Sequence, residues 1–177
     1  MRWTAAPILI LAGLLAACAA GAEEPGDGEP GSRRTGAAGS GDSHRSDTFP
    51  PTGQITLPSG RVVFLGLALS PAEQARGYME RKEIRPDEGL LFLFERPGVH
   101  RMWMKNCLVP IDMIWLNGQN RILAIEHAAP PCRTEPCPAY GPFINTHAVL
   151  ELRSGSAREE ELKVGDLLQI VTDLARP

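Results

Sequence analysis

Short blocks of alternating hydrophobic and polar residues follow one another from residue 54 to residue 174. Alternation with a period of two is typical of β-strands that bury one face. We expect strands at residues 54–57, 61–69, 89–94, 100–104, 111–116, 121–126, 148–152 and 167–171. A Pro-Ser-Gly turn joins the first two, and Asn-Gly-Gln-Asn joins the pair at 111–116 and 121–126, so both pairs should form hairpins.

Two short helices are expected between these strands. Residues 70–73 read Ser-Pro-Ala-Glu, which predicts an N-cap, a first-turn proline and a capping box, and Gly77 predicts the helix end. A second helix is expected at 156–162, with Ser156 and Glu159 as its capping box. Many short strands with two brief helices predict a mainly β (α+β) fold, with a single antiparallel sheet curled into a partly closed barrel.

The chain before the strands has two parts. Residues 1–17 combine a positive start, an apolar run and small residues, which is typical of a secretion signal. The apolar run is too short to span a membrane, because a membrane-spanning helix needs about 20 apolar residues. Residues 15–18 read Leu-Ala-Ala-Cys, which resembles the bacterial lipobox and implies that Cys18 carries the lipid anchor. Residues 18–53 contain almost no large apolar side chain, so we expect a flexible tether. A plain secreted protein is the alternative.

Composition restricts the partners. The chain of 177 residues has 18 Lys and Arg against 21 Asp and Glu and no basic stripe, so nucleic acid is not expected as a partner. One β-rich domain at 54–177 should follow the tether. We expect an exported protein that faces the periplasm or the cell exterior, with the membrane as a partner through its lipid anchor and no cofactor.

A polar and aromatic group at residues 103–112 is the candidate ligand site. Pro110 separates two strands and lets them turn back on each other, so Arg81, Lys105 and Asp112 should converge at one rim of the sheet. Two cations beside an aromatic floor suit an anionic or sugar-like ligand. The candidate ligand-binding residues are Arg81, Trp103, Lys105, Asn106, Asp112 and Glu151.

The same residues also fit a structural role. Tryptophan is often a core residue, and Asp112 could cap a turn or pair with Lys105 to fix strand register. Alternation within 111–116 places Asp112 and Ile114 on one face and Met113 and Trp115 on the other. Whether these groups meet in one pocket decides between the two interpretations.

Three cysteines remain if Cys18 is lipidated. Cys132 and Cys137 lie close together in a proline-rich loop, and in an oxidising compartment they should form a disulfide. Cys107 is then the odd thiol, expected to be buried and inert. Two alternatives stay open: a metal held by both loop cysteines with His127 and His147, and a redox-active disulfide.

Three motifs resemble one known family. They are Gly-Tyr-Met-Glu-Arg at 77–81, Gly-Leu-Leu-Phe at 89–92 and Met-Trp-Met-Lys-Asn-Cys-Leu-Val-Pro-Ile-Asp at 102–112. They are similar to the domain of unknown function 192 family, which implies a small β-rich domain, often behind a signal sequence, and assigns no activity. Tyr78 stands where Leu is usual, Leu90 where Met is usual and Cys107 where Thr is usual.

Common catalytic signatures, such as a phosphate loop or Gly-x-Ser-x-Gly, do not occur. Our first hypothesis is a lipid-anchored binding or accessory module with an unknown envelope ligand. One alternative is an envelope hydrolase that acts on carbohydrate or peptide through Asp112, Glu151 or His127, and it requires two facing carboxyl groups. Another is a structural protein–protein interaction domain, which requires an exposed apolar patch.

Overall fold

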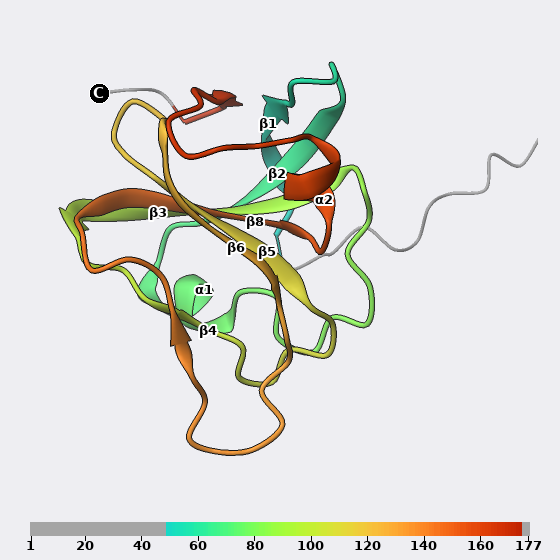
Figure 1. Cartoon of the computed structure of the whole chain (residues 1–177), viewed down its shortest axis with the longest axis vertical. Coiled ribbons are helices and arrows are strands. Elements are labelled where there is room, and N and C mark those ends of the chain that lie inside the picture. The colour runs from blue at the N-terminus through green and yellow to red at the C-terminus, as the bar shows by residue number, and fades with distance from the viewer. Residues whose placement is uncertain (1–48, 175–177) are drawn as a thin grey trace, which may run out of the picture. The chain divides into compact units, whose positions relative to one another are not determined.

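A seven-stranded mixed sheet organises residues 49–174, the part of the chain that the computed structural model describes (Figure 1). The signal peptide, Cys18 and most of the expected tether lie outside the described residues. The strand order is β6-β5-β8-β3-β2-β1-β9, and β4 and β7 form a separate two-stranded sheet. The strands are β1 (Pro51–Thr56), β2 (Val62–Ala68), β3 (Glu88–Gly98), β4 (Met102–Trp103), β5 (Ile111–Leu116), β6 (Ile122–Ala129), β7 (Ala139–Tyr140), β8 (Thr146–Arg153) and β9 (Gln169–Thr172).

The expected antiparallel sheet is wrong at one pair, because β2 and β3 run parallel. Between them the chain forms α1 (Pro71–Arg76) and a long connection, so it enters β3 in the direction of β2. Parallel neighbours need such a crossover, whereas a hairpin turn reverses the chain. The other pairs of this sheet are antiparallel, including the two expected hairpins, β1–β2 and β5–β6.

The expected partly closed barrel is not found among residues 49–174. The edge strands are β6 and β9, and they are not paired with each other. One bridge, between Arg121 and Leu167, joins the beginning of β6 to the segment before β9, supported by a hydrogen bond from Ile122 N to Asp166 O. This link lies at one end only, so the sheet is curled but open.

The first helix begins and ends as expected, and the second does not. The Ser70 side chain accepts from Glu73 N, and the Glu73 carboxylate accepts from Ser70 N, which completes the capping box of α1. The second helix, α2 (Ser156–Glu159), has Gly155 as its N-cap, and no side chain of the cap residue binds its first turn. The expected box of Ser156 and Glu159 is therefore wrong, because Ser156 is already the first helical residue and Glu159 N donates to Gly155 O. Asp112 of β5 accepts from Ala157 N in the first turn.

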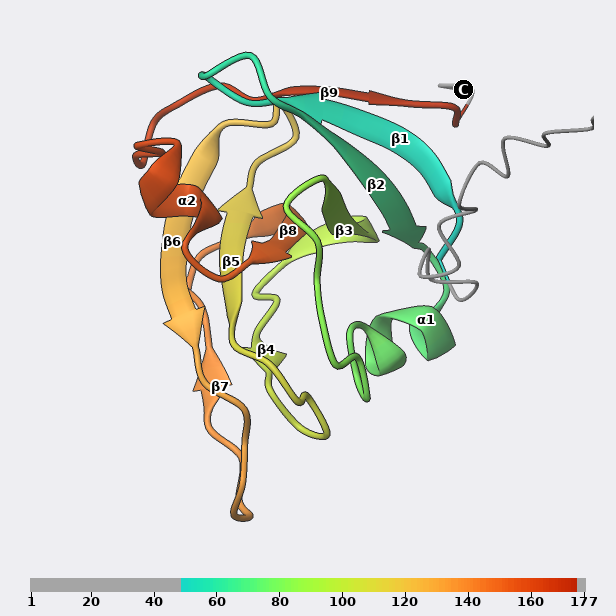
Figure 2. The same cartoon turned by 90° about the vertical axis from the view of Figure 1, so that its right-hand side faces the viewer.

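Apolar side chains cover both faces of the sheet. One core contains Leu150 and Leu152 of β8 together with Ala157 of α2, and the other contains Val149 of β8. This second core is closed by Tyr78, which follows α1, and by Met104, which follows β4. Figures 1 and 2 show α1 and β4 on the same side of the sheet, where the candidate site lies. Among residues 49–174, no helix has the length and apolarity that crossing a membrane requires.

Candidate ligand-binding site

Glu151 is the buried carboxyl group of the site. It lies on β8 between β3 and β5, opposite Leu90 and Met113. The residue is only 4% exposed, and its Oε2 has no hydrogen-bond partner. Burial disfavours the ionised form and raises the pKa of Glu151 to about 8. At neutral pH this carboxyl group therefore mostly keeps its proton and can donate a hydrogen bond.

A small pocket opens beside Glu151, between the end of α1 and the segment around β4. Its volume is about 20 Å³, which is room for a single water-sized group. The lining includes the apolar side chains of Phe92 and Met102 and the cations Arg76 and Lys105. Glu151 is the one carboxyl group among the described residues that line it.

Tyr78 is a second buried polar residue in the lining of this pocket. Its hydroxyl group has no hydrogen-bond partner, and the residue is 3% exposed. Burial raises the pKa of Tyr78 well above its ordinary value, and the carboxyl groups of Glu88 and Glu151 act in the same direction. The phenol therefore stays protonated at neutral pH, and Tyr78 borders both this pocket and a second cavity that Glu88 lines.

Lys105 and Trp103 form the rim of the pocket. Trp103 is 48% exposed, and Lys105 Nζ lies 5.5 Å from the centroid of its ring, within the range of a cation–π contact. Lys105 Nζ also lies 2.8 Å from Glu135 Oε1. The hydrogen bond from Lys105 is the main cause that lowers the pKa of Glu135.

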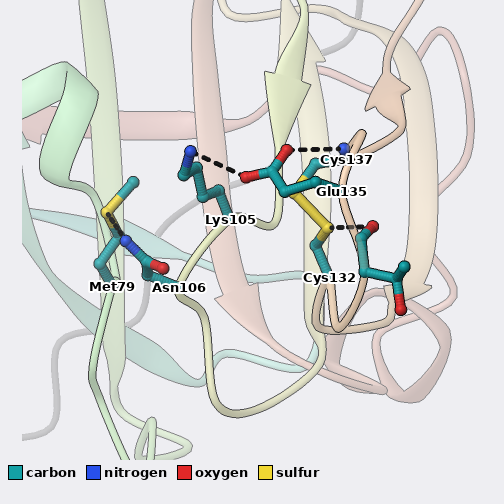
Figure 3. The surroundings of a disulfide bond; sticks show 7 residues. Met79, Lys105, Asn106, Cys132, Glu135 and Cys137 are labelled. Carbon is teal, nitrogen blue, oxygen red and sulfur yellow. Dashed lines mark hydrogen bonds and ion pairs between the residues drawn. A yellow bond between two sulfur atoms is a disulfide. The ribbon is translucent and has the colours of Figure 1, made fainter.

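The Cys132–Cys137 disulfide closes the loop that presents Glu135 (Figure 3). This pairing confirms the expected disulfide, and Cys137 N donates a hydrogen bond to Glu135 Oε2. With both thiols oxidised, the alternative metal site of two cysteines and two histidines loses its sulfur ligands. Among residues 49–174, no group of three His, Cys, Asp or Glu side chains is arranged to hold a metal ion.

Cys107 was expected to be buried, but it is only half-buried and lines the same pocket as Glu151. Burial and then the nearby Glu151 raise the pKa of the Cys107 thiol to about 12. A protonated thiol is a poor nucleophile, so the expected lack of reactivity agrees with this environment.

A wider groove adjoins the pocket and shares Gln74, Phe92, Met102 and Trp103 with it. Its volume is about 280 Å³, and its further lining includes Phe94, Val99, His100 and Arg101. The rings of Phe94 and His100 are stacked, with centroids 3.5 Å apart. Trp115 Nε1 donates to His100 O at 2.8 Å, which ties the backbone of the groove wall to the core. We call the pocket and this extension the Trp103 groove.

Of the six predicted site residues, the structure brings three to the pocket: Trp103, Lys105 and Glu151. Arg81 instead binds Glu88, with its Nη2 2.8 Å from Oε1. Asn106 is exposed, has a positive φ of 55° and donates to Met79 Sδ (Figure 3).

Asp112 lies on the opposite face of the sheet from Glu151. It is fully buried, and its two oxygens accept from Ala128 N and Ala157 N, each at 2.8 Å. The expected convergence of Arg81 and Asp112 with Lys105 is therefore wrong.

Sequence reasoning missed Tyr78, Cys107 and the adjoining aromatic wall. One signal was present, because Tyr78 and Cys107 are two of the three positions at which the chain departs from the pattern of the resembled family. Both departures line the pocket beside Glu151. These two side chains change the polarity of the pocket relative to the usual Leu and Thr.

Two solved structures are similar to this chain. One is a protein of unknown function from Novosphingobium aromaticivorans, with 34% identity, a TM-score of 0.58 and coverage of 68% of this chain and 84% of that one. The other is a putative transcription regulator from Sinorhizobium meliloti, with 30% identity, a TM-score of 0.58 and coverage of 66% and 90%. No curated protein matches the chain. The model of the DUF192 family, described as Uncharacterized ACR, matches residues 55–170, and the chain belongs to this family.

Proposed function

We propose that this protein is an exported, lipid-anchored binding module that takes a ligand from the cell envelope into the Trp103 groove. The observation that carries the proposal is the buried Glu151 carboxyl group, which lacks a hydrogen-bond partner and lines the pocket. Buried polar groups are nearly always hydrogen-bonded in folded proteins, and an unpaired one costs about 1–3 kcal/mol. A ligand that reaches into the pocket would supply the missing partner.

The choice of binding over hydrolysis rests on the number of carboxyl groups. Paired-carboxylate hydrolysis needs two such groups about 5–10 Å apart. Glu151 has no carboxyl companion in its pocket, and Asp112 is held by two backbone amides on the other face. An open groove with an exposed tryptophan beside a single buried acid is suited to holding a ligand.

Export and lipidation are supported by the signal-like residues 1–17 and by Cys18 at the end of the lipobox-like sequence. The Cys132–Cys137 disulfide agrees with an oxidising compartment outside the cytosol. Labelled palmitate supplied to a bacterial host should be incorporated into the wild-type chain and not into a Cys18→Ser variant. Equal labelling of both, or of neither, would contradict the anchor.

Ligand binding is tested with the full chain purified in detergent and titrated with soluble fragments of the cell envelope in a calorimeter. We expect saturable binding that Trp103→Ala weakens at least tenfold, because a ring-shaped ligand loses the surface on which it stacks. Val164→Ala is the matched control, since Val164 is 65% exposed and does not line the groove. Equal binding by both variants would place the ligand elsewhere.

A further inference from the structure

We propose that the ligand of the Trp103 groove is a small organic acid, with one carboxylate oxygen in the pocket and an apolar or aromatic body in the groove. This inference rests on the proposed binding function and deepens it. Three observations support it: the kind of polar group left unpaired, the charges that line the site and the size of the two cavities.

The unpaired groups are hydrogen-bond donors. The buried, protonated Glu151 carboxyl group and the Tyr78 hydroxyl group each carry an O–H, and neither has a partner in the protein. The O–H of Glu151, which lines the pocket, is satisfied by an acceptor. An anionic oxygen is the strongest acceptor, because charge-assisted hydrogen bonds are about twice as strong as neutral ones. The pocket volume of about 20 Å³ has room for one such oxygen.

The charged side chains of the lining favour an anion. Arg76 and Lys105 line the pocket, and Arg101 lines the adjoining groove. Apart from the mostly protonated Glu151, neither lining contains a carboxyl group among the described residues. Lys105 is already paired with Glu135, so Arg76 and Arg101 supply the excess positive charge. Such a concave site attracts anionic ligands and disfavours cationic ones.

The groove limits the size of the ligand body. Its volume of about 280 Å³ lies just below the range of about 300–1,000 Å³ that is typical of ligand pockets. Phe92, Phe94 and Trp103 supply apolar and aromatic surface along it. This combination fits a body of about one ring, joined by a short chain to the acid group.

The opposite interpretation is that the ligand is an amine that pairs with ionised Glu151. The pH dependence of binding distinguishes an acid ligand from an amine ligand. Glu151 faces Arg76 and Tyr78 from the α1 side, Lys105 and Cys107 from the segment after β4, and apolar Phe92 and Met113 from the flanking strands. Tyr78 and Cys107 keep their protons up to pH 9, because burial raises the pKa of both. An acid ligand needs protonated Glu151 and should leave as pH rises, whereas an amine should bind more tightly.

The experiment titrates the full chain in detergent with 3-phenylpropionate, 3-phenylpropanamide and 3-phenylpropylamine between pH 6 and pH 9. We expect the acid to bind at least tenfold more tightly than the amide at pH 7. The affinity for the acid should fall about tenfold between pH 7 and pH 9, because protonated Glu151, with a pKa of about 8, becomes scarce.

A Glu151→Gln variant is the control for this pH effect, because glutamine remains a neutral donor at every pH tested. The variant should lose the change in affinity for the acid between pH 7 and pH 9, whatever its affinity at pH 7.

Five outcomes overturn the inference. Tighter binding of the amine or the amide, or a pH-independent affinity for the acid in the wild type, assigns the groove to another ligand class and leaves the binding function standing. Tighter binding of a short peptide with a free C-terminal phenylalanine than of phenylpropionate assigns the groove to a chain end. If envelope fragments bind and none of the three probes does, the proposal of an acid ligand is wrong and the proposed binding function stands. If neither the fragments nor the probes bind, both the proposed binding function and the acid ligand are wrong.

Discussion

Glu151 and Asp112 lie on neighbouring strands, one register step apart, and their carboxyl groups are on opposite faces of the sheet. Asp112 is paired with Leu152, and Met113 with Glu151, in the β5–β8 ladder. Successive side chains on a strand point to opposite faces, so this single step separates the two acids. Asp112 accepts two backbone hydrogen bonds, whereas Glu151 Oε2 has no partner. One acid therefore stabilises the fold, and the other is available to a ligand.

We expect Asp112→Asn to destabilise the protein by about 2–4 kcal/mol, because the amide nitrogen cannot accept from the backbone N–H that it would face. The two lost or weakened contacts hold β6 at Ala128 and α2 at Ala157. Urea unfolding followed by circular dichroism measures the change. Ligand affinity should stay the same, because Asp112 does not line the Trp103 groove. A loss below about 0.5 kcal/mol would show that these contacts matter little.

Glu151 makes stability depend on pH in the opposite sense from an ordinary paired carboxylate. Its folded pKa of about 8 lies above the ordinary value of 4.5, so between these values the unfolded state binds fewer protons than the folded state. Stability from this group is complete below about pH 4.5 and falls by up to about 1.4 kcal/mol per pH unit until about pH 8.

The Glu151→Gln variant should lack this fall, because glutamine does not titrate. We therefore expect the melting temperature of the variant to exceed that of the wild type by a margin that grows from pH 5 to pH 8. Scanning calorimetry at each pH measures the margin. A wild-type and a variant curve that run parallel over this range would contradict the raised pKa of Glu151.

The features that sequence predicted well are those fixed by neighbouring residues. The capping box of Ser70 and Glu73 needs a spacing of three residues, and the Cys132–Cys137 disulfide needs a short loop. Both hairpins follow from turn residues between two alternating blocks. Alternation along β5 also places Ile114 in one core and Met113 in the other, as expected.

The features that sequence did not predict depend on residues far apart in the chain. The backbone N–H of Ala157 in α2 donates to Asp112, which lies 45 residues away in the sequence. The local sequence around Ser156 gives no sign of this distant cap. The parallel pairing of β2 with β3 depends on where the chain returns after α1, which no local pattern records. Whether Asp112 meets Glu151 depends on the register of β5 against β8. A shift of one residue in this register would decide whether the two side chains are direct neighbours on one face.

Removal of the Cys132–Cys137 disulfide by a double change to serine should lower the free energy of unfolding by about 2 kcal/mol, as the chain-entropy model gives for so short a loop. Thermal unfolding of the wild type with and without reductant provides the same comparison without substitution. Cys107→Ser is the control, since it removes a thiol and leaves the loop closed. An effect of reductant on the double variant as large as that on the wild type would contradict this assignment.

Glu135 should compete with an acid ligand for Lys105, because Lys105 Nζ already lies 2.8 Å from Glu135 Oε1 at the rim of the pocket. The pair is solvent-exposed and weak, so Glu135→Gln should tighten the binding of 3-phenylpropionate by about two- to fivefold. Lys105→Met should weaken binding and cancel the gain when the two changes are combined. Glu83→Gln is the matched control, since it removes the same charge from an exposed carboxylate that lines neither cavity. Calorimetry at low salt measures the affinity of each variant. An equal gain from Glu83→Gln would show that the effect comes from the net charge of the protein and not from competition for Lys105.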